Sequence, residues 1–424
     1  MKKINNKVLN SILGSTFFKL VSGVISFITV PFLLKALGTS EYAIWVTMTA
    51  LLAWLNLFDF GSGYSLKNKI TEATANKEIF KVQSLVAGTI QFYVLMTILI
   101  FFAFLISLLF VSIFKAHIFL SFAIYIPVIL SFPFTLGHFI IQGLKKFNIF
   151  NFFLLTQSIC WLVIVYAFQH RFFTINIYKL AGCYSGLFVI TNFTIMLTSL
   201  RSINFKFSSL LSLKNFRTSK SSLMVGTKFF VLQVTTVFMY SLGNILTYNN
   251  LKLINVAQFD TVNKVYTMGM TIFSVVISVF WTEISHEKAL GNKIKLLKLF
   301  RQLLLISTLF SLGSLIITLA IPALIEHWTR NIIHVSIKQI YPFCCLVTIQ
   351  AFAYSGAVFL NAFEELKGQI VLSFISAALM IPLSNALFNI NFGIGTVPLS
   401  SAILTLPTMV YVIYKAKDCV SRIT

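Results

Sequence analysis

The chain has 424 residues, of which 58% are hydrophobic and 10% are charged, and its formal net charge is +22. This composition excludes an ordinary soluble domain, in which about a quarter of the residues are charged. The excess of Lys and Arg could indicate a nucleic-acid binder, but the charges alternate with long apolar segments, which argues against that class. The sequence therefore predicts a protein that lies almost entirely within a membrane.

Apolar segments of membrane-spanning length follow one another along the whole chain. A spanning helix needs about 20 predominantly apolar residues, and twelve segments meet this requirement, which leaves only short loops between them. We therefore predict an all-α polytopic membrane protein with about 12 transmembrane helices. The predicted spans are 11–36, 42–63, 83–111, 118–142, 150–168, 179–200, 222–247, 257–281, 299–325, 339–360, 368–388 and 394–414.

The distribution of Lys and Arg between the loops predicts the orientation of the chain. If the N-terminus is cytoplasmic, the inner segments carry 23 of these residues and the outer loops carry 7. An excess of positive charge in short loops marks the cytoplasmic side of a membrane protein. We predict a multi-pass protein of the bacterial inner membrane with both termini in the cytoplasm, which requires an even number of spans.

The longest basic connection, 201–221, lies between the sixth and seventh predicted spans. Short matches occur in the same order on both sides of it, such as 14–18 with 226–230 and 75–77 with 291–293. These matches favour a duplicated six-span unit, with the substrate path between two pseudo-symmetric bundles. We predict an N-terminal six-helix bundle at 1–200, a cytoplasmic linker at 201–221 and a C-terminal six-helix bundle at 222–424.

Two lysines lie about two turns into equivalent spans of the two halves, Lys19 in span one and Lys228 in span seven. A charge at mid-bilayer costs at least about 2.5–3.5 kcal/mol on insertion scales, so it usually faces a cavity or a partner. We favour a role for both lysines in the substrate path. The alternative is that their long side chains extend to the inner interface. Asp59, near the inner end of span two, could be a cavity charge or a partner of Lys19.

Three further residues inside spans are candidates for the substrate path. Asp260 and Lys264 are four residues apart near the outer end of span eight, and their acid-before-base order on one helix face predicts an ion pair. A structural role for this pair is favoured, and a role in the path stays open. His138, in span four and one turn before Gln142, is the third candidate. The complete set of candidates is Lys19, Asp59, His138, Lys228, Asp260 and Lys264.

The sequence lacks the motifs of an enzyme. It contains no Gly-rich phosphate loop, no paired carboxylates at a plausible lumen position and no clustered His and Cys ligands. The five cysteines show neither metal nor redox spacing. We therefore expect no catalytic residue, no metal and no cofactor. Without a nucleotide site, transport must use a gradient or consumption of its substrate, and coupling to protons or sodium stays open.

Three stretches in the first part of the chain carry recognisable motifs. Residues 31–45, PFLLKALGTSEYAIW, enter the second span, and residues 54–63, WLNLFDFGSG, leave it ahead of KNK at 67–69. Residues 143–147, GLKKF, form the turn between spans four and five. In these motifs, in the number of spans and in the loop sizes, the chain resembles the O-antigen (Wzx-type) flippases. These belong to the polysaccharide-transporter branch of the MATE-like MOP superfamily.

This resemblance implies a fold and a function. It implies flipping of an undecaprenyl-pyrophosphate-linked O-antigen oligosaccharide from the cytoplasmic to the periplasmic leaflet by alternating access. Lys19 and Lys228 would suit such an anionic head group, because lysine binds phosphate as a point charge. The implied partners are the lipid-linked oligosaccharide and the membrane, with a polysaccharide polymerase and a chain-length regulator as further candidates, and no nucleic acid.

The sequence is less consistent with two other functions. A cation-coupled multidrug or small-molecule exporter of the same fold would want acidic residues in its lumen, whereas the candidate lysines outnumber any clear acid. A polytopic O-antigen polymerase or ligase typically has one large periplasmic loop, and the outer gaps at 325–339 and 248–256 are too short for it. A scaffold for glycosyltransferases stays open as an additional role.

Overall fold

The computed structural model describes residues 6–170, 172, 176–211, 230, 233–239, 241–363 and 365–422. The described residues form helices and connections, and no strand is found among them. The chain divides into two compact units, Met1–Gln233 and Val234–Thr424. The predicted all-α fold class is therefore confirmed.

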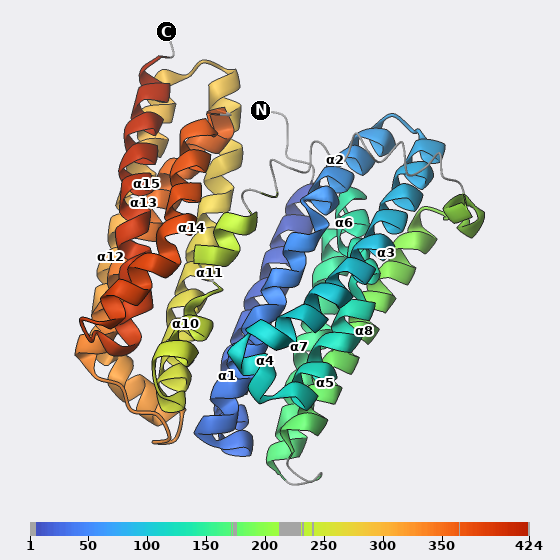
Figure 1. Ribbon diagram of the computed structural model, residues 1–424. Helices are drawn as coiled ribbons and strands as arrows, with labels where there is room; N and C mark the ends of the chain where they lie inside the picture. The colour runs from blue at the N-terminus through green and yellow to red at the C-terminus, as the bar shows by residue number, and fades with distance from the viewer. Residues whose placement is uncertain are drawn as a thin grey trace. The chain divides into compact units, whose positions relative to one another are not determined.

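The N-terminal unit is built from long helices joined by short connections, coloured blue to green in Figure 1. Three short 3-10 helices, η1 to η3, lie between or after them. The elements are α1 (Asn6–Leu51), η1 (Leu52–Asp59), α2 (Ser62–Ala75), α3 (Ile79–Phe110), α4 (Ser112–Ala116), α5 (Ile118–Leu130), η2 (Phe132–Thr135), α6 (Leu136–Gly143), α7 (Phe147–Gln169), α8 (Ile177–Ser202) and η3 (Phe207–Leu211).

Helix α1 contains the first predicted span and the start of the second. The apolar stretch from Phe17 to Asp59 has 43 residues, and at about 1.5 Å per residue it is roughly twice as long as a bilayer core of about 30 Å. Gly38 interrupts it with φ 72° and ψ 172°, a conformation that glycine adopts without steric cost. Beyond Gly38 the chain turns back, and α2 lies toward the end at which α1 begins (Figure 1).

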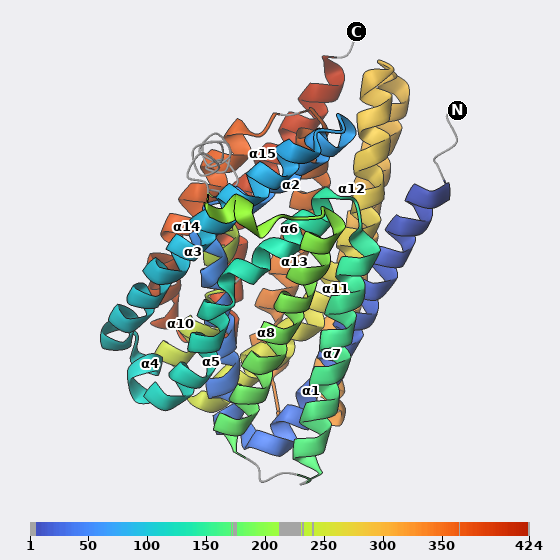
Figure 2. The same cartoon turned by 90° about the vertical axis from the view of Figure 1, so that its right-hand side faces the viewer.

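Close backbone approaches hold the N-terminal unit together. Helices α1 and α7 run side by side (Figure 2), and α6 packs against α8. A Cβ atom added to Gly137 of α6 would lie 2.7 Å from the backbone of Met196 in α8. Small residues that admit such contacts are typical of helix packing in membranes, where van der Waals contact drives association.

The fourth predicted span is bent. Helix α5 and the stretch Phe132–Gly143, which joins η2 to α6, meet at an angle of 52°. Pro133 stands near the start of η2, where it cannot donate a backbone hydrogen bond to the preceding turn. The proline therefore accounts for the bend.

The predicted linker begins on the surface of the N-terminal unit. Gln83 of α3 donates a hydrogen bond of 2.9 Å to the carbonyl of Asn204, and Gln91 donates one of 2.6 Å to the carbonyl of Leu210. The first part of the linker is thus fixed to α3. The rest of the predicted linker, 212–221, lies outside the described residues, and the predicted domain boundaries stay a prediction.

The C-terminal unit has a buried apolar core centred on α13. Helix α13 packs against α11, α12 and α15 (Figure 1), and its core includes Phe273, Leu303, Phe359 and Val412. Polar pairs cross the same interfaces, such as Ser307 with Ser355 at 2.6 Å. The elements are α10 (Gly243–Asn250), α11 (Leu253–Ala289), α12 (Lys293–Trp328), α13 (Ile337–Phe363), α14 (Lys367–Phe388), η4 (Gly393–Gly395) and α15 (Thr396–Ser421).

The helices establish a multi-pass membrane protein. By length and composition, 8 helices of the described residues can span a membrane, or up to 9 if the bent pair forms one span. The long stretch around Gly38 can supply two of the predicted spans. The seventh predicted span, 222–247, lies partly outside the described residues, so the number twelve stays a prediction.

Candidate functional site

Lys19 is exposed on α1. Its positive charge helps to lower the pKa of Lys67, another cation of the same unit. Among the described residues, no carboxylate forms an ion pair with Lys19. Lys228, its predicted counterpart, lies outside the described residues. The equivalence of the two lysines therefore stays a prediction.

Asp59 is the buried carboxylate of the N-terminal unit, with an exposed fraction of 4%. It ends the 3-10 helix η1, just before two residues with positive φ, Phe60 and Gly61. Its Oδ1 accepts a hydrogen bond of 2.7 Å from the Gly61 N–H, and its Oδ2 accepts one of 3.4 Å from the Tyr93 hydroxyl. The side chain of Gln233 hydrogen-bonds the same carboxylate.

These contacts give Asp59 a defined position but no cationic partner. The carboxylate is enclosed by N–H and O–H donors, which are the groups that stabilise a buried carboxylate in the absence of a cation. No ion pair joins Asp59 to Lys19 within the described part of the chain. The side chain instead fixes the turn between η1 and α2 and links it to α3.

Asp260 and Lys264 form the ion pair that their spacing on α11 predicts. Asn244 of α10 donates a hydrogen bond of 3.2 Å to Asp260 Oδ1. Asp260 is buried, while Lys264 is partly exposed. The pair connects α10 to α11 within the C-terminal unit, and whether it also takes part in transport is untested.

His138 lies on α6 of the N-terminal unit, next to side chains of α7 and α8. Its ring packs 5.0 Å from the ring of Phe150 in α7, and Asn192 of α8 lies beside it. Its Nε2 atom is buried and has no hydrogen-bond partner among the described residues. His138 of α6 thus contacts α7 and α8, and a role in the substrate path stays a prediction.

Lys67 was predicted only as one of many inner charges, and the structure gives it a specific environment. Its Nζ atom donates a hydrogen bond of 3.1 Å to Gln142 Oε1 of α6 and lies 5.6 Å from the ring centre of Phe147 in α7. Burial and the charge of Lys19 lower the pKa of Lys67 below the ordinary lysine value. The side chain therefore occupies a junction of α2, α6 and α7.

This junction brings two of the recognised motifs together. KNK at 67–69 follows the exit of span two, and GLKKF at 143–147 forms the turn after span four. Gly143 makes the approach possible, because a Cβ atom there would lie 2.9 Å from the Lys67 carbonyl oxygen. The motifs were the available signal for this site, although their spacing does not reveal that they touch.

No metal-binding arrangement is found in the described ranges, where no three His, Cys, Asp or Glu side chains come together.

Comparisons of the sequence with known proteins give short matches. No family model matches the chain. It is 39% identical over 84 residues to a Yersinia pseudotuberculosis protein named as an O-antigen export protein. It is 34% identical over 67 residues to a Salmonella typhi protein named as an O-antigen transporter. These matches cover 19% and 16% of the chain, and the chain spans less than a fifth of either relative's length.

Comparisons with solved structures cover nearly the whole chain. A multidrug resistance MATE family transporter of the MOP superfamily, in its inward-facing conformation, matches with a TM-score of 0.72 over 96% of this chain and 95% of its own, at 12% identity. The chain has the MATE fold. The lipid II flippase MurJ, in an inward closed conformation, matches with a TM-score of 0.71 over 95% of this chain and 87% of its own, at 14% identity.

These comparisons confirm the fold and the resemblance predicted from the sequence. Sequence identity of 12% to 14% shows the fold alone, because MATE folds carry more than one transport function. The two relatives named for O-antigen export and transport are similar to this chain only over short stretches, of 84 and 67 residues.

Proposed function

We propose that this chain flips a lipid-linked oligosaccharide, carried on undecaprenyl pyrophosphate, from the cytoplasmic to the periplasmic leaflet of the bacterial inner membrane. The observation that carries the proposal is Lys67, a partly buried cation held by Gln142 and Phe147 that has no carboxylate partner among the described residues. Lys19 of the same unit likewise forms no ion pair with a described carboxylate. Two cations in this position are suited to the phosphates of an anionic head group. The MATE fold and the names of the two O-antigen relatives support the same substrate class.

The alternative function, a cation-coupled multidrug exporter, is less well supported, because the two candidate carboxylates already have partners. A cationic drug requires a carboxylate that is free to receive it. Asp59 is enclosed by hydrogen-bond donors, and Asp260 is paired with Lys264. Neither carboxylate offers a site of that kind in the described structure.

Both termini are proposed to be cytoplasmic, on the basis of the Lys and Arg bias. A reporter that is active only in the periplasm, fused after Lys417, should be inactive. Activity of that fusion would contradict the proposed orientation and the even number of spans.

The proposed function is tested in a strain that lacks this gene. Deletion should cause undecaprenyl-linked saccharide to accumulate and surface polysaccharide to disappear, and the wild-type chain should reverse both effects. In the complemented strain, Lys19→Gln and Lys228→Gln should abolish surface polysaccharide at normal protein levels, whereas Arg at either position should partly preserve it. A wild-type phenotype for the double Gln variant would contradict a role of the two lysine charges in transport.

A further inference from the structure

The junction of α2, α6 and α7 presents a lysine whose charge is not neutralised within the described structure. A lysine ammonium group has three N–H donors and no acceptor. One donor of Lys67 is used by Gln142 Oε1, and the ring of Phe147 lies against the group. No described carboxylate pairs with Lys67, and Lys19 adds a second positive charge nearby. Keeping two such cations together costs free energy unless an anion joins them.

Packing of α2 on α6 does not require the charge of Lys67. The hydroxyl of Thr71, one turn further along α2, donates a hydrogen bond of 3.0 Å to the carbonyl of Gly143. Ile70 also packs close to Gly143, because a Cβ atom added there would lie 3.0 Å from the Ile70 side chain. The two helices are therefore joined without the ammonium group, so the charge of Lys67 is available for a role beyond packing.

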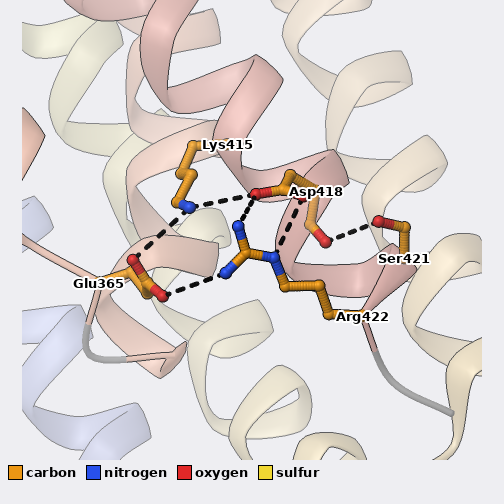
Figure 3. Close-up of polar contacts among 5 residues, drawn as sticks. All are labelled: Glu365, Lys415, Asp418, Ser421 and Arg422. Carbon is orange, nitrogen blue, oxygen red and sulfur yellow. Dashed lines mark hydrogen bonds and ion pairs between the residues drawn. The ribbon is translucent and has the colours of Figure 1, made fainter.

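Cations at the predicted inner end of the C-terminal unit have a different environment. Figure 3 shows Lys415, near the end of α15, and Arg422, which directly follows α15. Both lie beside the carboxylates of Asp418 and Glu365. Arg422 Nη2 lies 2.7 Å from Asp418 Oδ2, and Lys415 Nζ lies 3.1 Å from the same oxygen and 3.8 Å from Glu365 Oε2. These cations are neutralised by carboxylates of their own unit.

Lys295 of α12 is neutralised in the same way. Its Nζ lies 2.8 Å from Glu283 Oε1 and 2.7 Å from Glu287 Oε1, both on α11. The comparison shows that paired cations occur in the C-terminal unit, whereas the described carboxylates leave Lys67 unpaired. The positive charge available to an external anion therefore includes Lys67 in the N-terminal unit.

We propose that Lys67, together with Gln142 and Lys19, forms a phosphate-binding site that receives the pyrophosphate of the lipid-linked substrate. This proposal rests on the proposed function and assigns the head-group contact to a residue that the sequence did not single out. Gln142 positions the ammonium group through its carbonyl oxygen, which leaves its amide N–H groups as further donors for phosphate oxygens.

The test uses the full-length purified chain in nanodiscs of phosphatidylcholine, a lipid without net charge. Binding of undecaprenyl pyrophosphate is measured against undecaprenol, which has the same tail and no phosphate. Lys67→Gln should weaken binding of the pyrophosphate about tenfold or more, since a hydrogen bond to a charged group contributes about 1.5–3 kcal/mol. Lys67→Arg should retain most of the affinity, and undecaprenol binding should not change.

Two further variants separate anion binding from a structural role. Lys145→Gln removes an exposed charge from the turn after α6 and should leave binding unchanged. Gln142→Glu keeps Lys67 but gives it an internal carboxylate partner. We expect Gln142→Glu to lose binding while its melting temperature is maintained or raised, because the new ion pair neutralises the lysine and still joins α2 to α6.

The outcomes distinguish the two proposals. If the wild-type chain binds undecaprenyl pyrophosphate no better than undecaprenol, the proposed function itself is contradicted. If the wild-type chain prefers the pyrophosphate but Lys67→Gln and Gln142→Glu bind it equally well, the site at Lys67 is wrong and the proposed function stands. Equal losses in Lys67→Gln and Lys145→Gln would also overturn the site, because they would indicate a general effect of surface charge.

Discussion

Lys67 and Asp59 show how the surroundings of a charged residue decide what it can do. Both lie near the inner end of the second predicted span, eight residues apart in the sequence. Asp59 is enclosed by donors from Gly61, Tyr93 and Gln233. Lys67 has a neutral acceptor and an aromatic ring beside it, with another cation nearby. The carboxylate is therefore satisfied internally, whereas the ammonium group still favours an anion.

Proton uptake on ligand binding tests the state of Lys67. Burial and Lys19 lower its pKa in the free protein, and a bound pyrophosphate would raise that pKa because it favours the charged form. At alkaline pH, as the solution approaches the ordinary lysine pKa from below, binding should therefore take up protons, and affinity should fall as the pH rises further. Calorimetry in two buffers with different ionisation enthalpies measures this uptake. The wild-type chain should show it and Lys67→Gln should not, and equal uptake in both would contradict the assignment.

The same pKa shift has a consequence for folding stability. The folded free protein holds the proton on Lys67 less tightly than the unfolded chain, so this residue reduces stability at neutral pH. Its unfavourable contribution disappears as the pH rises through the unfolded pKa of lysine. In detergent at neutral pH, Lys67→Gln should melt no lower than the wild type. A large drop in melting temperature would instead indicate that Lys67 is mainly structural.

Substitutions of Asp59 test whether this carboxylate is a structural acceptor. Asp59→Ala leaves the buried donors of Gly61 and Tyr93 without their partner, at a cost of about 1–3 kcal/mol for each buried group left unsatisfied. Asp59→Asn keeps one oxygen acceptor and should be less destabilising. Thermal unfolding in detergent should rank wild type above Asn and Asn above Ala. Unchanged stability in Asp59→Ala would contradict the structural role.

At the scale of elements, the sequence predicts features that lie within one helix, but it does not predict contacts between two helices. The apolar segments predicted the helices that can span a membrane among the described residues, and four-residue spacing predicted the pair Asp260 and Lys264, because both features belong to a single helix. The contact of Lys67 with Gln142 joins residues 75 apart in the chain. It depends on the close approach at Gly143, which no periodicity encodes. The contact of Asp59 with Tyr93 on α3 could not be predicted for the same reason.

The packing of α6 on α8 can be tested at a glycine. In Gly137→Ala the new Cβ atom would lie 2.7 Å from the Met196 backbone, which has no flexible side chain to move. Overpacking of this kind typically costs about 1–3 kcal/mol, so the melting temperature should fall. Gly182→Ala on α8 is the matched control, because nothing lies within 4 Å of its added Cβ. Equal effects of the two substitutions would contradict the described packing.

At the scale of the whole molecule, the MATE fold is compatible with the proposed transport but does not identify a substrate. The fold is established by solved structures that match at least 95% of the chain, while the named O-antigen relatives match less than a fifth of it. The proposed substrate class therefore rests on side chains, above all on Lys19 and Lys67, which form no ion pair with a carboxylate among the described residues. The predicted duplication of a six-span unit requires that the two units superpose, and this stays a prediction.

Transport by the purified chain tests the central claim most directly. Proteoliposomes are prepared with a lipid-linked oligosaccharide of the producing strain, and exposure of its sugar at the outer leaflet is followed with a membrane-impermeant oxidising reagent. The account predicts that the wild-type chain makes the sugar of both leaflets accessible, that Lys67→Gln does so more slowly, and that protein-free liposomes expose only the outer half. Accessibility in the wild-type proteoliposomes equal to that of protein-free liposomes would contradict the proposed flipping activity.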